Sequence, residues 1–312
     1  MLKPRALKPG SRIAVVAPAS PFKRDALDAF AAGTAELARL GFVPVHDETV
    51  FARGEPAYLA GSAEVRATAI RSALRDPSID GIVCIRGGYG SVQLLPLLDI
   101  EEARQARKPF IGYSDLTAIL SFLTVQCGLV AFHGPMLDLR FSRGEAGYDR
   151  ASFLNAVSRA EPVGELAPDG LEVFRGGDAR GLLLGGTVTQ LLATMGTAFA
   201  FDPPPGFVLF FEEVGERPYR LDRMVTQLRQ TGILARASAI VIGELNGCDE
   251  PGGTLTGRGV MAQVLADFPG PVIAGFPSGH TNGPAYTLPL GVSCRVVATG
   301  QPRLVIEDAA VE

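Results

Sequence analysis

Histidine and cysteine are scarce in this sequence, and that scarcity limits the chemistry it can support. Only three histidines occur among 312 residues, His46, His133 and His280, so the search for a histidine base is short. The four cysteines lie far apart, and no two form a C-x-x-C pair. This spacing indicates neither a zinc site nor a dithiol redox motif, and we expect no metal or cofactor.

Long apolar runs and blocks of basic residues are also missing. No stretch approaches the length of a membrane-spanning helix, and no apolar signal-peptide core precedes Pro9 and Gly10. The formal charge of -4 arises from 29 basic and 33 acidic residues, without a long Lys/Arg block. We therefore expect a cytoplasmic protein that binds neither membrane nor nucleic acid and takes a small neutral or zwitterionic ligand.

Strand and helix patterns alternate along the first part of the chain. Apolar runs at residues 12–17, 81–85 and 110–112 predict buried strands, and residues 26–40 repeat apolar side chains at helical spacing. The pattern predicts a flavodoxin-like α/β domain with a parallel sheet over residues 1–140. In such sheets ligands bind outside the carboxyl ends of the strands.

The remainder of the chain has a different pattern. Residues 141–180 break into charged and Gly/Pro-containing pieces, which we interpret as an inter-domain crossing. Residues 181–312 contain more strand and turn, with an apolar strand at 207–211 and a β-rich tail at 288–306. They predict a second, β-rich α/β C-terminal domain.

Ser114 lies at a strand-to-helix turn, in Ile111-Gly112-Tyr113-Ser114-Asp115. The turn matches a nucleophile elbow only in part, because Leu116 stands where the G-x-S-x-G form has its second glycine. A serine at the start of a helix is more often an N-cap, whose oxygen accepts a hydrogen bond from an otherwise unpaired amide. From this motif alone the cap is the favoured interpretation, and Ser114 is the residue to test.

A glycine-rich loop, Arg86-Gly87-Gly88-Tyr89-Gly90-Ser91, follows the strand at 81–85. Its glycines allow close approach of the backbone, and its amides can point at an anion, although glycines equally serve a tight turn. The loop does not match G-x-G-x-x-G, so no dinucleotide is indicated. Because a flavodoxin-like strand order places it beside the Ser114 turn, we expect the two loops to share a pocket.

A carboxylate and a histidine occupy later strand ends. The strand at 207–211 runs into Glu212 and Glu213, of which only one can point into a given site. His280 lies in a loop rich in glycine and proline, and spacing favours it only slightly over His133; His46 is interpreted as a surface residue. The order serine, carboxylate, histidine is also that of the α/β-hydrolases, but triads are recognised by geometry.

Together these motifs resemble the serine LD-carboxypeptidases of peptidase family S66, which include murein tetrapeptide carboxypeptidases and microcin C immunity peptidases. The resemblance extends over nearly the whole chain. It rests on short motifs in one order: Ala17-Pro18-Ala19-Ser20, Arg86-Gly87-Gly88-Tyr89-Gly90, Ile111-Gly112-Tyr113-Ser114-Asp115, His133-Gly134-Pro135-Met136, Phe211-Glu212-Glu213-Val214-Gly215-Glu216, Pro218-Tyr219-Arg220-Leu221-Asp222-Arg223 and Gly279-His280.

The resemblance implies a Ser-Glu-His triad and an oxyanion hole of backbone amides, acting on the amide between meso-diaminopimelate and the terminal D-alanine of a recycled muropeptide. It also suggests a homodimer. Arg86 is a candidate for holding the substrate carboxylate, because a guanidinium can bind a carboxylate bidentately. The residues are Ser114, Glu212 and His280 for the triad, with Glu213 as the alternative acid, Gly88 and Asp115 for the oxyanion hole, and Arg86 and Tyr89 for substrate binding.

Two departures and two alternatives accompany this interpretation. Gly185-Gly186-Thr187 stands where the family commonly has Gly-Gly-Asn, which puts an amide contact in question. The chain lacks a long insertion between the carboxylate and histidine regions, which favours the carboxypeptidase branch over the microcin branch. The alternatives are a serine peptidase that cleaves a peptide-nucleotide such as processed microcin C, and a non-catalytic flavodoxin-like module that binds phosphate through residues 86–91.

Overall fold

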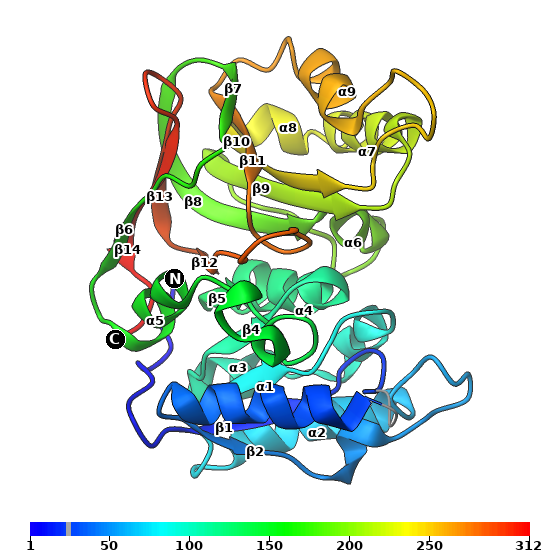
Figure 1. Cartoon of the computed structure of the whole chain (residues 1–312), viewed down its shortest axis with the longest axis vertical. Coiled ribbons are helices and arrows are strands. Elements are labelled where there is room, and N and C mark those ends of the chain that lie inside the picture. The colour runs from blue at the N-terminus through cyan, green and yellow to red at the C-terminus, as the bar shows by residue number, and fades with distance from the viewer. Residues whose placement is uncertain (23–25) are drawn as a thin grey trace.

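Two β-sheets, one above the other in Figure 1, organise the computed structural model, which describes residues 1–22 and 26–312. The first sheet has the strand order β12-β5-β4-β3-β1-β2, and the second has the order β6-β14-β13-β8-β9-β10-β11-β7. Among the helices of the described ranges, none combines the length and apolar character needed to cross a membrane.

The first sheet confirms the predicted flavodoxin-like fold. Its first five strands are parallel and lie in the order 2-1-3-4-5, with the most apolar strands at the centre. The helix that follows the Ser114 turn is a short α-helix continued by a π-helix over Phe122–Gln126. The elements are β1 (Arg12–Val16), α1 (Leu27–Arg39), β2 (Val43–Val45), α2 (Ala63–Arg75), β3 (Gly81–Cys84), α3 (Ile100–Ala106), β4 (Phe110–Gly112), α4 (Thr117–Ser121) and β5 (Ala131–His133).

The second sheet has a parallel centre, β8-β9-β10-β11, with antiparallel strands on both sides. Helices α7, α8 and α9 cover its outer face in Figure 1. Its elements and the neighbouring helices are α5 (Arg150–Ser158), β6 (Pro162–Leu166), β7 (Glu172–Arg175), β8 (Asp178–Thr187), α6 (Val188–Ala193), β9 (Phe207–Val214), α7 (Pro218–Gln230), α8 (Ile233–Arg236), β10 (Ala237–Asn246), α9 (Gly257–Val264), β11 (Val272–Phe276), β13 (Ser293–Val297) and β14 (Arg303–Ala309).

The chain crosses between the two sheets more than once. Strand β12 (Leu288–Leu290), in the predicted second domain, pairs antiparallel with β5 of the first sheet. Strands β6 and β7, in the predicted crossing, are the outer strands of the second sheet. The division into 1–140, 141–180 and 181–312 stays a prediction, and the strand pairing ties its three parts together.

Strand β9 separates two hydrophobic clusters. Val208 and Phe210 pack into the cluster shared with the first sheet, whereas Leu209 and Phe211 pack into the cluster under α6 to α9. Because successive strand residues face opposite sides, continuing this alternation directs Glu212 toward the first sheet and Glu213 toward the helices. The pattern of the strand thus assigns different environments to two adjacent carboxylates.

Candidate active site

Ser114 has a strained backbone conformation at the carboxyl end of β4. Its φ of 65° lies in the left-handed region, which residues other than glycine rarely adopt. The cap position of the short 3-10 helix Ser114–Leu116 is Tyr113, and no side-chain cap hydrogen bond forms there. The N-cap interpretation of Ser114 is therefore wrong. At Gly112 a Cβ would lie 3.2 Å from the Cβ of Leu116, which explains the glycine two residues before the serine.

The glycine-rich loop touches the Ser114 turn, as predicted. Strands β3 and β4 are neighbours, and a Cβ on Gly87 would lie 2.8 Å from the Cβ and 2.9 Å from the Oγ of Ser114. The amide of Ser91 donates to Asp115 Oδ2 at 2.8 Å. A Cβ on Gly88 would overlap the Ser20 hydroxyl, so glycine at 87 and 88 is required for this approach.

A buried arginine binds the backbone of the glycine-rich loop. Arg66 is 2% exposed, and its Nη1 donates to the carbonyls of Pro18 at 2.8 Å and Gly90 at 2.7 Å. Burial raises the pKa of Asp115, while its hydrogen bonds with Ser91 and the charge of Arg66 oppose that rise. The carboxylate of Asp115 therefore joins the two loops, and its backbone amide is the predicted oxyanion donor.

Glu212 and His280 form a buried carboxylate–imidazole pair. Glu212 is fully buried, and its Oε2 lies 2.8 Å from His280 Nδ1 and accepts a hydrogen bond from the His280 amide at 3.1 Å. The Thr187 hydroxyl donates to Glu212 Oε1. Burial alone would raise the pKa of Glu212, but its interactions with His280, His133 and Thr187 together outweigh burial and hold that pKa below the ordinary value.

Glu213 takes no part in this pair. Thr189 donates to Glu213 Oε2 from its amide at 2.9 Å and from its hydroxyl at 2.6 Å, and the amide of Val214 donates to Oε1 at 3.0 Å. Burial raises the pKa of Glu213, and these bonds oppose the rise. The carboxylate thus secures the start of α6 to the end of β9.

His133 is a core residue beside the pair. It is fully buried, its Nδ1 lies 3.0 Å from the Ser278 hydroxyl, and its ring packs 5.0 Å from that of Phe210. Burial lowers the pKa of His133 from 6.5 to about 4. This environment suits a neutral, structural imidazole and leaves His280, whose side chain is 22% exposed, as the accessible one.

Arg86 and Tyr89, the remaining predicted residues, flank Gly87 and Gly88 in the glycine-rich loop. The ring of Tyr113, the residue before Ser114, lies 5.1 Å from the ring of His280. Arg86 Nη1 lies 3.6 Å from Asp138 Oδ2, and the half-exposed Tyr89 packs its ring 5.9 Å from that of Tyr58. Roles in substrate binding for Arg86 and Tyr89 stay predictions.

Sequence reasoning missed three residues that hold the pair in place. Thr187, which stands where the family commonly has asparagine, donates to Glu212. Asn246 Nδ2 donates to the His280 carbonyl at 2.7 Å. Arg140 donates to the carbonyls of Gly279 and Thr281, on both sides of His280. The departure of Gly185-Gly186-Thr187 from the family's Gly-Gly-Asn had already drawn attention to Thr187 in the sequence. Neither Asn246 nor Arg140 stands in a motif, so their contacts emerge only from the folded chain.

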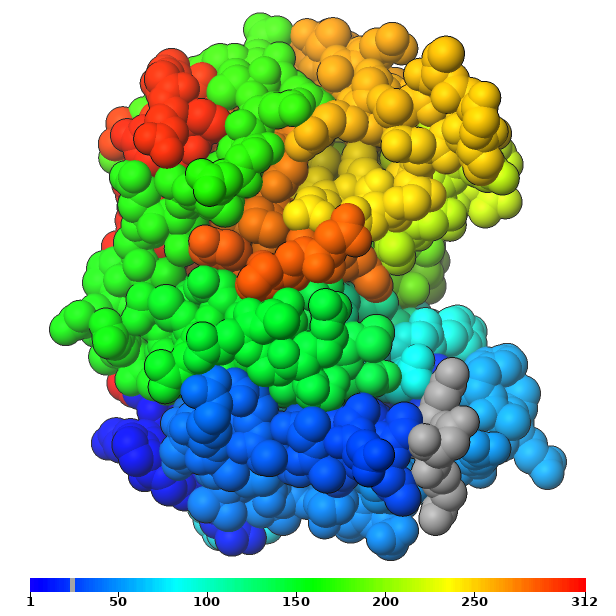
Figure 2. Space-filling view, viewed as in Figure 1, coloured from blue at the N-terminus to red at the C-terminus, as the bar shows by residue number. Residues whose placement is uncertain are grey.

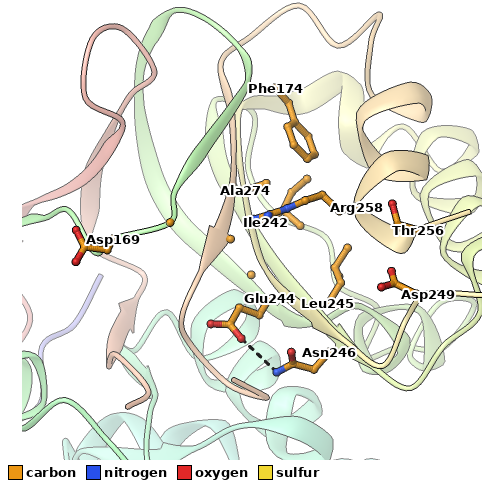
Figure 3. A pocket seen from close by; sticks show the side chains of 13 residues that line it. Asp169, Phe174, Ile242, Glu244, Leu245, Asn246, Asp249, Thr256, Arg258 and Ala274 are labelled. Carbon is orange, nitrogen blue, oxygen red and sulfur yellow. Dashed lines mark hydrogen bonds between the residues drawn. The ribbon is translucent and has the colours of Figure 1, made fainter. Parts of the chain in front are cut away.

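The molecule is hollowed between its two halves, on the side where cyan residues of the first half face yellow-green residues of the second (Figure 2). A separate cavity of about 460 Å³ lies at the carboxyl ends of β10 and β11 (Figure 3). Glu244 and Asn246 at its edge contact the His280 loop, but Ser114, Glu212 and His280 do not line it. Across residues 1–22 and 26–312, no group of three or more His, Cys, Asp or Glu side chains could hold a metal ion.

Two family models match this chain, and together they place it among the hydrolases. The N-terminal domain of the LD-carboxypeptidase family matches residues 13–134, and the C-terminal domain of that family matches residues 180–296. A murein tetrapeptide carboxypeptidase of Pseudomonas aeruginosa is 34% identical over 282 residues, which cover 86% of this chain and 88% of that protein. The chain belongs to the LD-carboxypeptidase family, peptidase family S66.

Solved structures agree with this assignment. A muramoyltetrapeptide carboxypeptidase from Oxalobacter formigenes superposes with a TM-score of 0.82 at 28% identity, covering 96% of this chain and 99% of that one. The microcin C7 self-immunity protein MccF superposes with a TM-score of 0.89 at 24% identity over the whole of both chains. The second likeness establishes a shared fold.

The buried His133 predicts a specific loss of stability in acid. Because the folded chain keeps this imidazole neutral while the unfolded chain takes up a proton below about pH 6.5, its contribution is complete above that pH and is lost progressively toward pH 4. Between pH 7.5 and 5.0 the loss should be about 2 kcal/mol. Urea unfolding of the wild type and of His133→Gln at both pH values measures it. An equal pH dependence in both proteins would contradict this account.

Proposed function

We propose that the protein is a serine-type LD-carboxypeptidase that removes the terminal D-alanine from murein tetrapeptides in the cytoplasm, as part of peptidoglycan recycling. The observation that carries the proposal is the buried Glu212–His280 pair, with Tyr113, next to the strained Ser114, packed against the histidine ring. Membership of the family supplies the reaction class.

The proposed reaction is acyl transfer. His280 takes the proton of the Ser114 hydroxyl as the oxygen attacks the scissile carbonyl, and Glu212 holds the imidazole tautomer and stabilises its protonated form. The amides of Gly88 and Asp115 bind the developing oxyanion. His280 then protonates the leaving amine of D-alanine, and water hydrolyses the acyl-enzyme by the reverse use of the same groups.

The substrate is inferred from relatives and from chemistry. The Pseudomonas aeruginosa and Oxalobacter formigenes relatives are named for murein or muramoyl tetrapeptides. A carboxypeptidase must also bind the free carboxylate of its substrate, and Arg86, the first residue of the glycine-rich loop, is the proposed partner, with Tyr89 as a further contact. By resemblance to the family, we propose that the enzyme acts as a homodimer and without a cofactor.

Replacing the nucleophile gives the first test. Ser114→Ala should lower the rate of D-alanine release from the tetrapeptide by about 10⁴-fold or more, because no other group can form the acyl-enzyme. The assay is chromatographic detection of D-alanine, with circular dichroism to establish that the variant is folded. A parallel assay with a peptide-nucleotide distinguishes the microcin-type activity. Full turnover by Ser114→Ala would refute the assignment.

The adjacent carboxylates provide a matched pair of variants. Glu212→Gln should lower kcat by about 10³- to 10⁴-fold, because an amide can stabilise neither the required tautomer nor the imidazolium. Glu213→Gln should lower kcat by less than about tenfold, since that side chain only joins α6 to β9. Steady-state kinetics on both variants decides the matter, and equal losses would contradict the assignment of the acid.

A further inference from the structure

Arg140 is a buried guanidinium that reaches from the first half of the chain into the His280 loop. It is 4% exposed, and its Nη2 donates to the Gly279 carbonyl at 2.6 Å and to the Thr281 carbonyl at 2.9 Å. These two residues flank His280. A single nitrogen of Arg140 therefore fixes the backbone on both sides of the proposed catalytic base.

The other hydrogen bonds of Arg140 connect that loop with the turn of the nucleophile. Its Nη1 donates to the carbonyls of Gly283 and Gly147, both at 3.2 Å, and its Nε donates to the Tyr113 hydroxyl at 3.4 Å. The guanidinium carbon also lies 5.7 Å from the centre of the Tyr113 ring. Arg140 thus contacts the residue directly before Ser114 and the residues directly beside His280.

The position of Arg140 is itself fixed at the first sheet. The amides of Leu137 and Asp138 donate to the carbonyls of Cys84 at 3.1 Å and Ile85 at 2.8 Å, at the carboxyl end of β3. The segment therefore starts from the strand that also carries the glycine-rich loop. A shift of Arg140 relative to the first sheet would be transmitted to the histidine loop.

The backbone of His280 is constrained at its own polar atoms as well. Its amide donates to Glu212, and its carbonyl accepts from Asn246 at 2.7 Å. The five hydrogen bonds of Arg140 all go to neutral oxygens, so no opposite charge offsets the desolvation of the buried guanidinium. This desolvation cost suggests that the geometry fixed by Arg140 has a function. Backbone carbonyls of Gly279 and Thr281 would be left without these donors if the guanidinium were removed.

We propose that Arg140 is a positioning residue, which sets the His280 imidazole relative to Ser114 by binding the backbone of the histidine loop and the Tyr113 hydroxyl together. This inference rests on the proposed function of Ser114 and His280. It assigns to Arg140 an effect on the chemical step and not on substrate affinity, because Arg140 is buried and its hydrogen bonds go to the protein itself.

Three variants test the proposal. Arg140→Met should lower kcat for D-alanine release by about 100-fold with KM changed less than about threefold, since a displacement of about 1 Å can cost that much in rate. Arg140→Lys, which keeps a cation that can reach carbonyls, should recover at least about tenfold of that loss. Arg143→Met is the matched control, because it removes an exposed arginine from the same segment and should leave kcat unchanged.

A second readout separates positioning from loss of folding. Adding guanidinium ion at millimolar concentration to Arg140→Ala should restore part of kcat, whereas it should restore nothing to Glu212→Gln. The rate of fluorophosphonate labelling of Ser114 should fall in parallel with kcat across the series of variants. Any variant of low stability is assayed at low temperature, and the same relation should hold there. A folded Arg140→Met with wild-type kcat and labelling rate would overturn the proposal; a wild-type enzyme that neither releases D-alanine nor is labelled would instead refute the proposed function.

Discussion

The contact between the buried Glu212 carboxylate and the His280 imidazole is the interaction on which the rest of the site depends. A carboxylate with no exposed surface is costly unless it is paired, and loss of a partner of such a buried pair costs about 3–5 kcal/mol. Here the His280 ring and amide and the Thr187 hydroxyl provide the partners. Glycines make room for the carboxylate: a Cβ at Gly243 or Gly279 would lie 2.5 Å and 2.7 Å from atoms of Glu212.

In the proposed mechanism the Glu212–His280 pair can act on Ser114 only because two sheets are held against each other. Strand β12 leaves the second half of the chain to pair with β5, and the Thr187 amide donates to the Thr117 hydroxyl at the start of α4. The inner face of β9 packs into the cluster shared with the first sheet. Rigid connection of this kind lets side chains from the turn after β4, from β9 and from the loop after β11 keep a fixed geometry, which catalysis by positioned groups requires.

Much of this arrangement could be predicted from sequence because it follows from local patterns. Apolar runs indicated the parallel strands, and the strand order of the flavodoxin-like domain correctly placed the glycine-rich loop against the Ser114 turn. Resemblance to the family favoured Glu212 over Glu213 as the acid that pairs with the histidine. The alternation of side chains along β9 gives the physical reason why Glu212, and not Glu213, faces His280. What could not be predicted depends on contacts between distant segments.

Arg140 and Asn246 illustrate that limit, since each bonds to backbone atoms of residues 279–283 across a long stretch of chain and belongs to no motif. The strained φ of Ser114 is another example, because the sequence around it favours a helix cap. Such features arise from the packing of whole elements, which a local pattern does not record.

The most direct test of the account is to treat the wild-type protein with a fluorophosphonate and to map the modified residue by mass spectrometry. Only a serine activated by a neighbouring base reacts quickly with such a probe. One adduct is expected, on Ser114, and it should disappear when Glu212 is replaced by glutamine. Absence of labelling in the folded wild type, or an adduct on another serine, would contradict it.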